Sequence, residues 1–282
     1  MSLDELQRHL DKIAKEHNQK GIPEFEGYSP EEMALLLYEP LSKDCLVQFN
    51  VLQPEEYIQI PILNQAQFIL QQIHQQGKIK LTPKGYMPVK LVKDIYDQGF
   101  MQEEFVEKGL QKLYSETTSY TMLLSHMLLD AARLTKKQNH WWSLTKQGEK
   151  LLEDPGGLLH ALMIGFGQKL NWSFFDGYGE GPIGQLGWAF SLFLLHTYGD
   201  VERPDTYYAE KYFRAFPDLV QFIAPSYLRT AEENAYSGYS IRTFERFLAH
   251  FNLVHIQKGK KWDDPDIISK TPLLDALVRV RK

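Results

Sequence analysis

The sequence predicts a mainly α-helical fold with short β-hairpins, organised as repeated winged-helix-like units in a helical protein. The main observation is a pattern, L-T-x-x-G, that occurs twice and has a looser third version. The three copies lie at residues 81–85, 144–148 and 269–274. In each copy a β-rich, basic segment ends in Thr, and an apolar helical run follows it. A helix, a strand pair and a capped helix in this order are typical of winged-helix units.

The threonine of each copy is expected to cap the helix that follows. These residues are Thr82, Thr145 and Thr271. A threonine hydroxyl at the N-cap accepts a hydrogen bond from an otherwise unpaired amide of the first helical turn. Proline suits the next position, where its missing N–H is not needed. Pro83 and Pro272 occupy that position in two of the copies.

Turn signals and periodicity divide the chain, which is long enough for about two ordinary domains. Residues 1–60 are expected to form an N-terminal helical extension, because apolar residues recur at helical spacing near its start. They are Leu3, Leu6, Leu10 and Ile13. Residues 154–157, Asp-Pro-Gly-Gly, form the clearest boundary. We therefore expect two winged-helix-like units at 61–154, and a helical domain ending in a third such unit at 158–282.

Composition excludes several classes of protein. A hydrophobic content of 43% is sufficient for packed cores, so wholesale disorder is not expected. A single cysteine, Cys45, leaves no internal disulfide framework and no Cys-rich zinc site. The sequence opens with no signal-peptide pattern, and its longest apolar stretch, 186–195, is far shorter than the ~20 residues of a membrane span. We expect a cytoplasmic protein without cofactor, metal site or membrane partner.

The charge is segregated along the chain. The net charge of −5 disfavours nucleic-acid binding, but residues 78–93 carry +5 and residues 131–150 carry +4. A third basic window, 242–261, also carries +4, although the aspartates that follow reduce it to +1 by residue 266. The first two windows coincide with two of the expected wings. They are the better evidence for binding to phosphate.

Eight lysines are the candidate nucleic-acid contacts, because Lys on a wing neutralises backbone phosphates. They are Lys78, Lys80, Lys84, Lys90, Lys93, Lys136, Lys137 and Lys146. DNA is the partner that this pattern indicates. The segments before the strands argue against it, because 65–76 and 117–132 contain no Lys or Arg with which a recognition helix would bind phosphate.

The histidines and the known catalytic motifs indicate neither a catalytic nor a metal site. His126 and Asp130 stand four residues apart and share a helical face, but the surrounding residues are apolar, which predicts a satisfied core histidine. His250 and His255 lack the spacing of zinc-binding motifs. We therefore expect a non-enzymatic binding or regulatory protein.

Two alternatives stay open. The first is a protein-interaction or assembly module, including a homo-oligomer, that uses the aromatic-rich helices at 182–216. The second is an enzyme whose site includes Asp176 and Glu180, beside Tyr178 in a glycine-rich segment. The glycines of that segment match no phosphate-binding spacing, and tight helix packing is their simpler explanation.

Several stretches carry a resemblance to a known family. They are residues 26–33 (EGYSPEEM), 80–88 (KLTPKGYMP), 247–253 (FLAHFNL) and 270–273 (KTPL). They resemble an uncharacterised family of bacterial cytoplasmic proteins, and they are similar to stretches in some proteins related to the plasmid ORF-3 group. The resemblance implies a fold that agrees with the one expected above. It implies no activity and therefore no functional residues.

Overall fold

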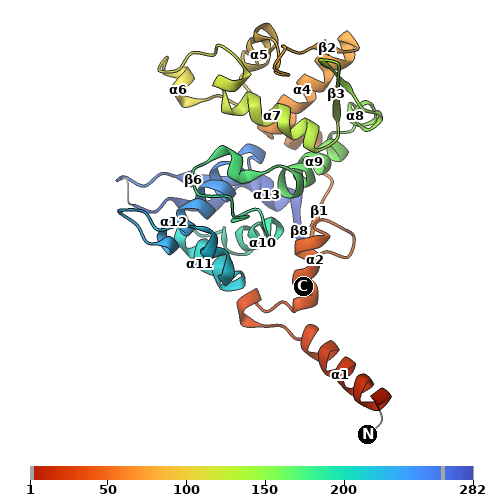
Figure 1. Ribbon diagram of the computed structural model, residues 1–282, viewed down its shortest axis with the longest axis vertical. Helices are drawn as coiled ribbons and strands as arrows, with labels where there is room; N and C mark the ends of the chain where they lie inside the picture. Colours follow the sequence, from red (N-terminus) through yellow and green to blue (C-terminus); the bar gives the residue numbers. More distant parts are fainter. Residues whose placement is uncertain (1–2, 262–263, 282) are drawn as a thin grey trace. The chain divides into compact units, whose positions relative to one another are not determined.

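The computed structural model describes residues 3–261 and 264–281, and the chain divides into two compact units. Unit 1 is discontinuous and comprises Met1–Asn50, Gly177–Glu245 and Val254–Lys282. Unit 2 comprises Val51–Asp176 and Arg246–Leu253. Both are mainly helical with short antiparallel strands, which confirms the expected fold class (Figure 1). The expected division of the chain into domains at 1–60, 61–154 and 158–282 stays a prediction.

Unit 2 is built around two buried helices and a small sheet. Its helices are α3 (Pro54–Tyr57), α4 (Pro61–Gln76), α5 (Val89–Tyr96), α6 (Glu104–Glu107), α7 (Tyr120–Ala131), α8 (Lys146–Leu151) and α9 (Pro155–Ile164), and its strands are β2 (Ile79–Lys80), β3 (Thr135–Gln138) and β4 (Trp141–Leu144). A π-helix, Gly165–Lys169, continues α9. A side chain at Gly165 would place its Cβ 2.9 Å from the Cβ of Ala132, so glycine permits this π-helix to lie close to the end of α7.

The sheet of unit 2 has the strand order β2-β4-β3, with antiparallel pairing throughout. The segments 78–81 and 140–144, which precede the first two copies of the L-T-x-x-G pattern and so belong to two successive expected units, therefore share one sheet. Residues 82–86 form a tight turn in which the Thr82 amide donates to the Tyr86 carbonyl (2.8 Å) and the Tyr86 amide donates to Thr82 Oγ1 (3.0 Å). The expected separate first hairpin is wrong for these residues.

The three expected threonine caps have different outcomes. Thr145 accepts from the Gly148 amide and Thr271 accepts from the Leu274 amide, which confirms both as N-caps. Thr82 caps no helix, so that expectation is wrong. The reason is Gly85, whose φ of 84° turns the chain back before a helical turn can form, and α5 begins only at Val89.

Unit 1 contains α1 (Leu3–Asn18), α2 (Pro30–Tyr38), β1 (Val47–Phe49), α10 (Trp188–Tyr198), β5 (Arg203–Pro204), α11 (Asp205–Ala215), α12 (Ala231–Ser240), β6 (Val254–Gln257), β7 (Ile267–Lys270), α13 (Pro272–Leu277) and β8 (Val278–Val280). A π-helix, Ile241–Glu245, follows α12 directly. Its core is aromatic: the rings of Phe190, Tyr208, Tyr212 and Phe244 are fully buried. A capping box formed by Ser29 and Glu32 is present at the start of α2.

The two units share one order of elements. In unit 2 it is α4, β2, α5, α7, β3, β4 and α8, with the short α6 inserted before α7. In unit 1 it is α10, β5, α11, α12, β6, β7 and α13. The sheet of unit 1 has the order β5-β7-β6, so in both units the first strand pairs with the second strand of the hairpin. Both hairpins lead into a helix capped by threonine.

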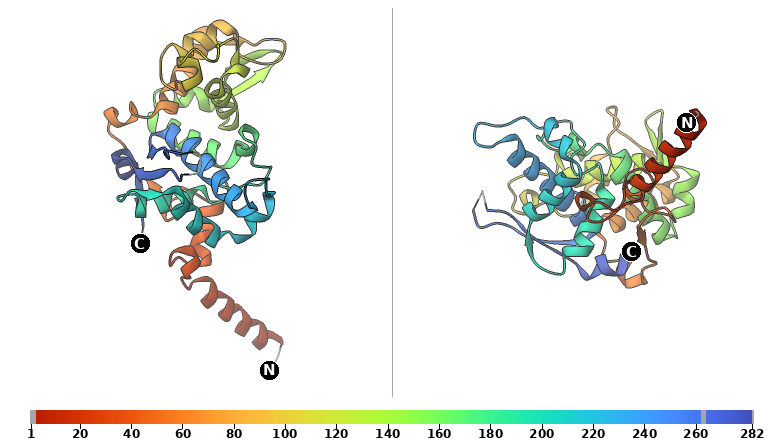
Figure 2. Two further views of the ribbon diagram at one scale, coloured as in Figure 1. Left: turned by 90° about the vertical axis from the view of Figure 1, so that its left-hand side faces the viewer. Right: turned by 90° about the horizontal axis from the view of Figure 1, so that it is seen from below.

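Helix α1 buries none of its residues (Figures 1 and 2). A closed turn follows it, in which the Ile22 amide donates to the Tyr28 carbonyl (3.0 Å). Lys211 Nζ anchors this turn to α11 through Glu26, at 2.9 and 3.0 Å from the two carboxylate oxygens. The start of unit 1 is thus fixed to its core, whereas α1 itself presents all its faces to solvent.

Candidate functional site

The outer face of the β2-β4-β3 sheet carries basic and aromatic side chains. Lys80 and Gln138 pair with Trp141 from either side, and Lys136 pairs with the next outward residue, Ser143. Residues paired across antiparallel strands point to the same side of a sheet, and every second residue of a strand does likewise. The outer sheet face therefore consists of Lys80, Lys136, Gln138, Trp141 and Ser143. It contains no carboxylate.

Lys78 extends this face. Its Nζ lies 4.4 Å from the centre of the Trp141 ring, which is a cation–π geometry. Trp141 is half-buried, whereas Lys78, Lys80 and Lys136 are exposed. A flat aromatic ring thereby shares the solvent side of the sheet with three lysines, of which Lys78 lies over the ring.

The inner face of the same sheet is buried and anchored by Asp130 at the end of α7. Trp142 is fully buried, and its indole N–H donates to Asp130 Oδ1 (3.2 Å). Asp130 also accepts from Thr135 Oγ1 (2.6 Å) and pairs with Lys137 Nζ (2.9 Å). Burial by itself would raise the pKa of Asp130, but these two donors outweigh it and hold the pKa below its ordinary value.

A buried histidine–glutamate hydrogen bond lies behind Asp130. His126 Nδ1 is 2.7 Å from Glu116 Oε1, and both side chains are almost wholly buried. The other oxygen of Glu116 accepts from the Met87 amide (2.5 Å). The sequence correctly predicted His126 as a core histidine sharing a face with Asp130, whose Oδ2 lies 3.9 Å from His126 Nε2. It gave no signal for Glu116, because nothing in the local pattern marks this acid as buried.

The eight candidate lysines are all exposed, but they do not form one group. Lys78, Lys80 and Lys136 come together around Trp141. The others lie elsewhere on unit 2: Lys84 on the turn at 82–86, Lys90 and Lys93 on α5, Lys137 at the sheet edge and Lys146 at the start of α8. Among the residues that the structure describes, Lys137 is the one member of the eight with a carboxylate partner.

The third basic window differs, because three of its five cations are used inside the fold. Arg242 is buried and donates to the carbonyls of Gly181 (2.6 Å) and Gly179 (2.8 Å). Arg246 donates to the Phe175 carbonyl. Lys258 lies 2.5 Å from Glu245 and 2.9 Å from Asp266. These three cations bind backbone carbonyls or carboxylates of the protein itself, so they are not available to neutralise phosphate.

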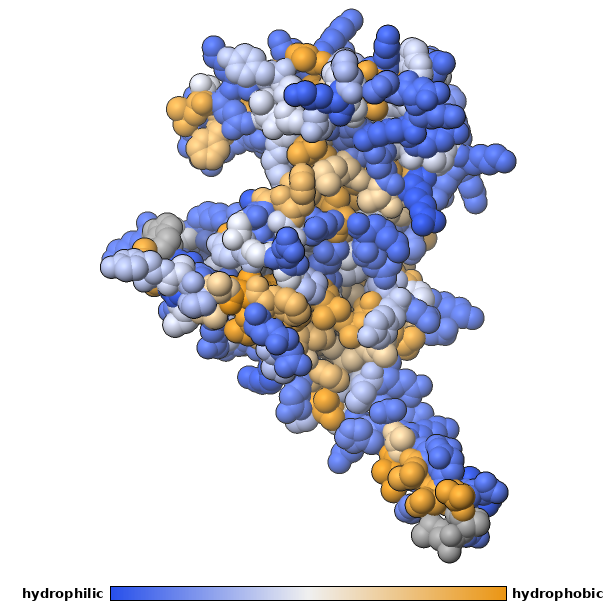
Figure 3. Space-filling view, in the orientation of Figure 1, coloured by the Kyte–Doolittle hydropathy of each residue, from blue (hydrophilic) through white to orange (hydrophobic). Residues whose placement is uncertain are grey.

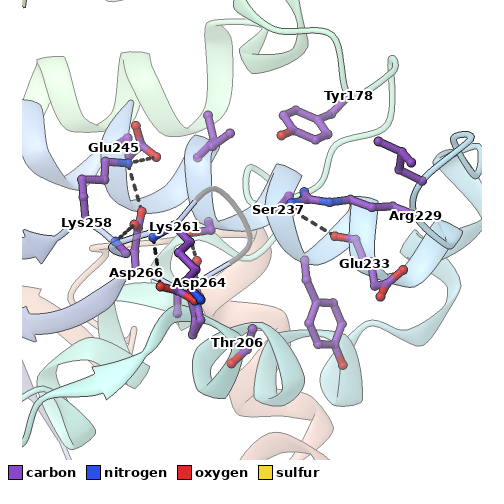
Figure 4. Close-up of a pocket in the computed structure, with 17 residues that line it drawn as sticks. Tyr178, Thr206, Arg229, Glu233, Ser237, Glu245, Lys258, Lys261, Asp264 and Asp266 are labelled. Atoms are coloured by element: carbon purple, nitrogen blue, oxygen red, sulfur yellow. Dashed lines mark hydrogen bonds and ion pairs between the residues drawn. The ribbon is translucent and has the colours of Figure 1, made fainter.

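Unit 1 has a cavity of about 770 Å³ beside the π-helix at 241–245 (Figure 4). Its charged walls are largely satisfied internally: Lys258 bridges Glu245 and Asp266, and Arg229 donates to Ser237 Oγ (2.7 Å). Asp205 accepts from Ser240 Oγ (2.6 Å), and burial raises its pKa despite that bond. Several of the charges that line the described part of the cavity are therefore already paired within the fold.

The carboxylates proposed for an enzyme do not line this cavity. Asp176 is half-buried at the end of unit 2, and Glu180 is exposed in unit 1. Residues 3–261 and 264–281 contain no group of three or more His, Cys, Asp or Glu side chains arranged for a metal ion. The same residues contain no helix of the length and hydrophobicity needed to cross a bilayer.

A second buried titratable cluster lies in unit 2. His250 Nε2 is 3.2 Å from the Tyr120 hydroxyl, and the Arg246 guanidinium lies 5.4 Å from the centre of the Tyr120 ring. Burial, reinforced by the charge of Arg246, lowers the pKa of His250 to about 4. Burial raises the pKa of Tyr120 well above its ordinary value. Both groups are therefore neutral at physiological pH and join residues 246–253 to α7.

Comparison with known proteins finds a similarity for one segment of the chain. The class of protein defined so far is a mainly helical protein whose described residues form three small antiparallel sheets, one of which carries a basic outer face. A family model described as the Y4jL N-terminal domain matches residues 59–157, the segment that runs from α4 into α9. No curated protein and no solved structure matches the chain.

The match confirms, for this segment, the expected similarity to an uncharacterised family. It covers less than half of the chain, and of the four stretches that carried the resemblance it includes 80–88. It includes the whole β2-β4-β3 sheet and all eight candidate lysines. The bacterial origin and the relation to the plasmid ORF-3 group stay predictions.

Proposed function

We propose that this is a non-enzymatic protein that binds nucleic acid, with DNA as the expected partner, through the phosphate backbone. The observation that supports the proposal is the outer sheet face, where Lys78, Lys80 and Lys136 surround Trp141 without a carboxylate on the same face. Lysines without ion-pair partners gain most from neutralising phosphates, because no local pair has to be broken. We also regard the element order of each unit as a winged-helix-like arrangement.

Within that arrangement, α7 would be the helix that reads base edges, and its burial argues against this role. None of its 12 residues is exposed, and seven of them are buried, among them Met122, Ser125 and His126. Base readout needs a helix whose side chains can enter the major groove. Phosphate contacts from the sheet remain, and such contacts give binding that depends on salt and depends little on sequence.

The test is a titration against fluorescent random-sequence duplex and single-stranded DNA at two salt concentrations. We expect binding at low salt that weakens steeply as salt increases, because displaced counterions drive it. The double variant Lys80→Glu with Lys136→Glu is expected to bind at least about 10-fold more weakly. It should also lower the salt slope by about 2, because each of the two lysines would otherwise neutralise one phosphate.

The matched control changes the same charge elsewhere. Lys20→Glu with Lys43→Glu alters two exposed lysines of unit 1 and leaves the sheet intact. We expect it to retain most of the affinity. Equal decreases in affinity for the two double variants would mean that net charge, and not the outer sheet face, governs binding. If the natural chain binds neither DNA probe at low salt, the proposal of nucleic-acid binding is wrong.

A second candidate function is self-association, which α1 favours. Leu3, Leu6, Leu10 and Ile13 follow the spacing of coiled-coil core positions, and their side chains are 86%, 43%, 51% and 49% exposed. Apolar side chains gather along one side of α1 in Figure 3. By contrast, the aromatic side chains on which the assembly hypothesis depends, such as Phe190 and Tyr212, are buried in unit 1.

We expect the partner of α1 to be the same helix of a second copy. A seam with one apolar residue every three or four positions fits a facing helix, whereas a wider apolar face is typical of a membrane surface. Sedimentation of Leu6→Asp with Leu10→Asp tests this: the variant should be monomeric at concentrations at which the natural chain is dimeric. Arg8→Asp with Lys15→Asp, on the other side of α1, is the control. A natural chain that stays monomeric at high concentration would exclude this candidate.

A further inference from the structure

We propose that the outer sheet face is a stacking platform for a single-stranded nucleic acid, in which one base stacks on the ring of Trp141 while Lys78, Lys80 and Lys136 hold the flanking phosphates. This inference rests on the proposed function and specifies its substrate class. It adds a contact to the base itself, which phosphate binding does not require.

The first argument is the contrast between two adjacent tryptophans. Trp142 is fully buried, donates to Asp130 and lies with its ring centre 4.3 Å from that of His126. Trp141 has none of these core contacts and points to the opposite side of the sheet. Because Trp142 already fills the core on the inner side, the half-buried Trp141 leaves part of a large aromatic ring on the solvent side of the sheet.

The second argument is what covers Trp141. The group observed over its ring is Lys78 Nζ, an exposed and flexible cation. A nucleobase offers the same ring a larger flat surface, and the displaced ammonium can then reach the adjacent phosphate. Aromatic rings flanked by lysines on a sheet are the means by which single strands are held with little sequence preference.

The third argument distinguishes a single strand from a duplex. The bases of a duplex are stacked on each other and cannot lie on Trp141. Readout of bases in a duplex would instead need an exposed helix in the major groove, and no residue of α7 is exposed. The outer sheet face is therefore suited to unstacked bases.

The experiment compares three probes of equal length: oligo(dT), a base-free deoxyribose-phosphate strand and a duplex. Affinity is followed by anisotropy and by quenching of tryptophan emission. We expect oligo(dT) to bind about 5- to 100-fold more tightly than the base-free strand, which is the range expected for one stacked base. The base-free strand carries the same phosphates, so it isolates the contribution of stacking.

Variants assign the effect to Trp141. Trp141→Ala should abolish the preference for oligo(dT) and the quenching, while Trp141→Phe should keep part of the preference. Ile267→Ala is the matched control, because Ile267 is half-buried and holds the corresponding position in the sheet of unit 1. Thermal melting of each variant verifies that it is folded.

The outcomes separate the two proposals. Equal binding of oligo(dT) and the base-free strand would overturn the stacking inference and leave phosphate binding in place. Tighter binding of the duplex than of oligo(dT) would likewise overturn it. Binding to none of the three probes would overturn the proposed function together with this inference.

Discussion

The sheets of the two units have the same strand order and opposite surface chemistry. When the three-stranded sheets are aligned by their strand register, Ile267 of unit 1 corresponds to Trp141 of unit 2. In the same way Pro204 corresponds to Lys80, and His255 corresponds to Lys136. Two positions are unchanged, since Ser269 and Gln257 correspond to Ser143 and Gln138. The unit 1 sheet thus keeps the polar positions and lacks the lysines and the aromatic ring.

The charged residues near the two sheets differ in the same way. In unit 1, Lys258 pairs with Glu245 and Asp266, and Lys270 lies 3.0 Å from Asp200 and 2.7 Å from Asp275. In unit 2, Lys80 and Lys136 have no such partner among the residues that the structure describes. One topology can therefore either neutralise its cations internally or present them to solvent. This difference is the reason that we propose unit 2, rather than unit 1, for binding.

The largest expected effect concerns the two faces of the unit 2 sheet. Trp142→Ala should lower the free energy of unfolding by about 3–5 kcal/mol, because it leaves a cavity and removes the indole N–H that donates to Asp130. Trp141→Ala should cost less than about 1 kcal/mol, as expected for a surface side chain. Urea unfolding of both variants measures this. Similar decreases for the two would show that Trp141 is a structural residue.

A pH dependence should distinguish the histidines of the two units. The pKa of His250 is lowered to about 4, against about 6.5 in an unfolded chain. As the pH falls from about 6.5 to 4, His250 becomes protonated in the unfolded chain but stays neutral in the folded state. The free energy of unfolding should therefore fall by up to about 3 kcal/mol.

His250→Gln tests the assignment of this pH dependence. The variant should flatten the curve of unfolding free energy against pH between about 6.5 and 4. His255→Gln is the control, because His255 is exposed on the unit 1 sheet. A slope that survives His250→Gln would assign the dependence to other groups.

A smaller effect is expected for the carboxylates beside the sheets. Asp130→Asn should cost about 1–3 kcal/mol at neutral pH, because Asp130 accepts from Thr135 and Trp142 and pairs with Lys137. Since the pKa of Asp130 is lowered in the fold, its contribution is full above pH ~4 and is lost as the pH falls through the folded-state value.

Asp266→Asn provides the comparison in unit 1. Its partner Lys258 is 60% exposed, so solvent screens the pair and the change should cost less than about 1 kcal/mol. Chemical denaturation at pH 7 and pH 3 measures both variants. Equal costs at pH 7 would contradict the different roles of the two carboxylates.

The smallest expected effect is a gain of binding by transfer. His255→Lys with Ile267→Trp gives the unit 1 sheet two of the residues that distinguish unit 2. We expect affinity for oligo(dT) to increase about twofold to fivefold and the salt slope to rise by about 1, because one more phosphate is neutralised. Anisotropy at two salt concentrations detects this. An unchanged salt slope would show that the new lysine touches no phosphate.

Much of the fold could be predicted from local signals. The caps at Thr145 and Thr271 and the capping box at Ser29 depend on residues a few positions apart, and all three are present. The glycines of the two L-T-x-x-G copies have different causes. Gly85 permits a positive φ, whereas a Cβ at Gly148 would lie 2.1 Å from the Leu134 carbonyl oxygen. The two copies have the same sequence pattern although their glycines have different roles. The pattern alone therefore predicts a helix cap at Thr82, where the structure has a turn.

The candidate site was predictable only as a set of charged residues. The basic windows identified the lysines, but pairing between β2 and β4 decides which of them meet, and that pairing joins residues that lie far apart in the chain. Trp141 and Trp142 are adjacent and chemically identical. Only the register assigns one to the core and the other to solvent, because a shift of one residue would exchange them.

The pairing of β1 with β8 constrains how the chain is made. Val47 pairs with Val280, and Phe49 pairs with Val278, so unit 1 cannot close its first sheet until residue 280 has left the ribosome. At ordinary synthesis rates of about 5–20 residues per second, roughly 10–50 seconds pass between the synthesis of β1 and that of β8. Throughout this interval its edge is an open template for other strands. A nascent chain stalled before residue 278 should therefore depend on chaperones to stay soluble, whereas the released chain, in which β8 is free to pair, should depend on them much less.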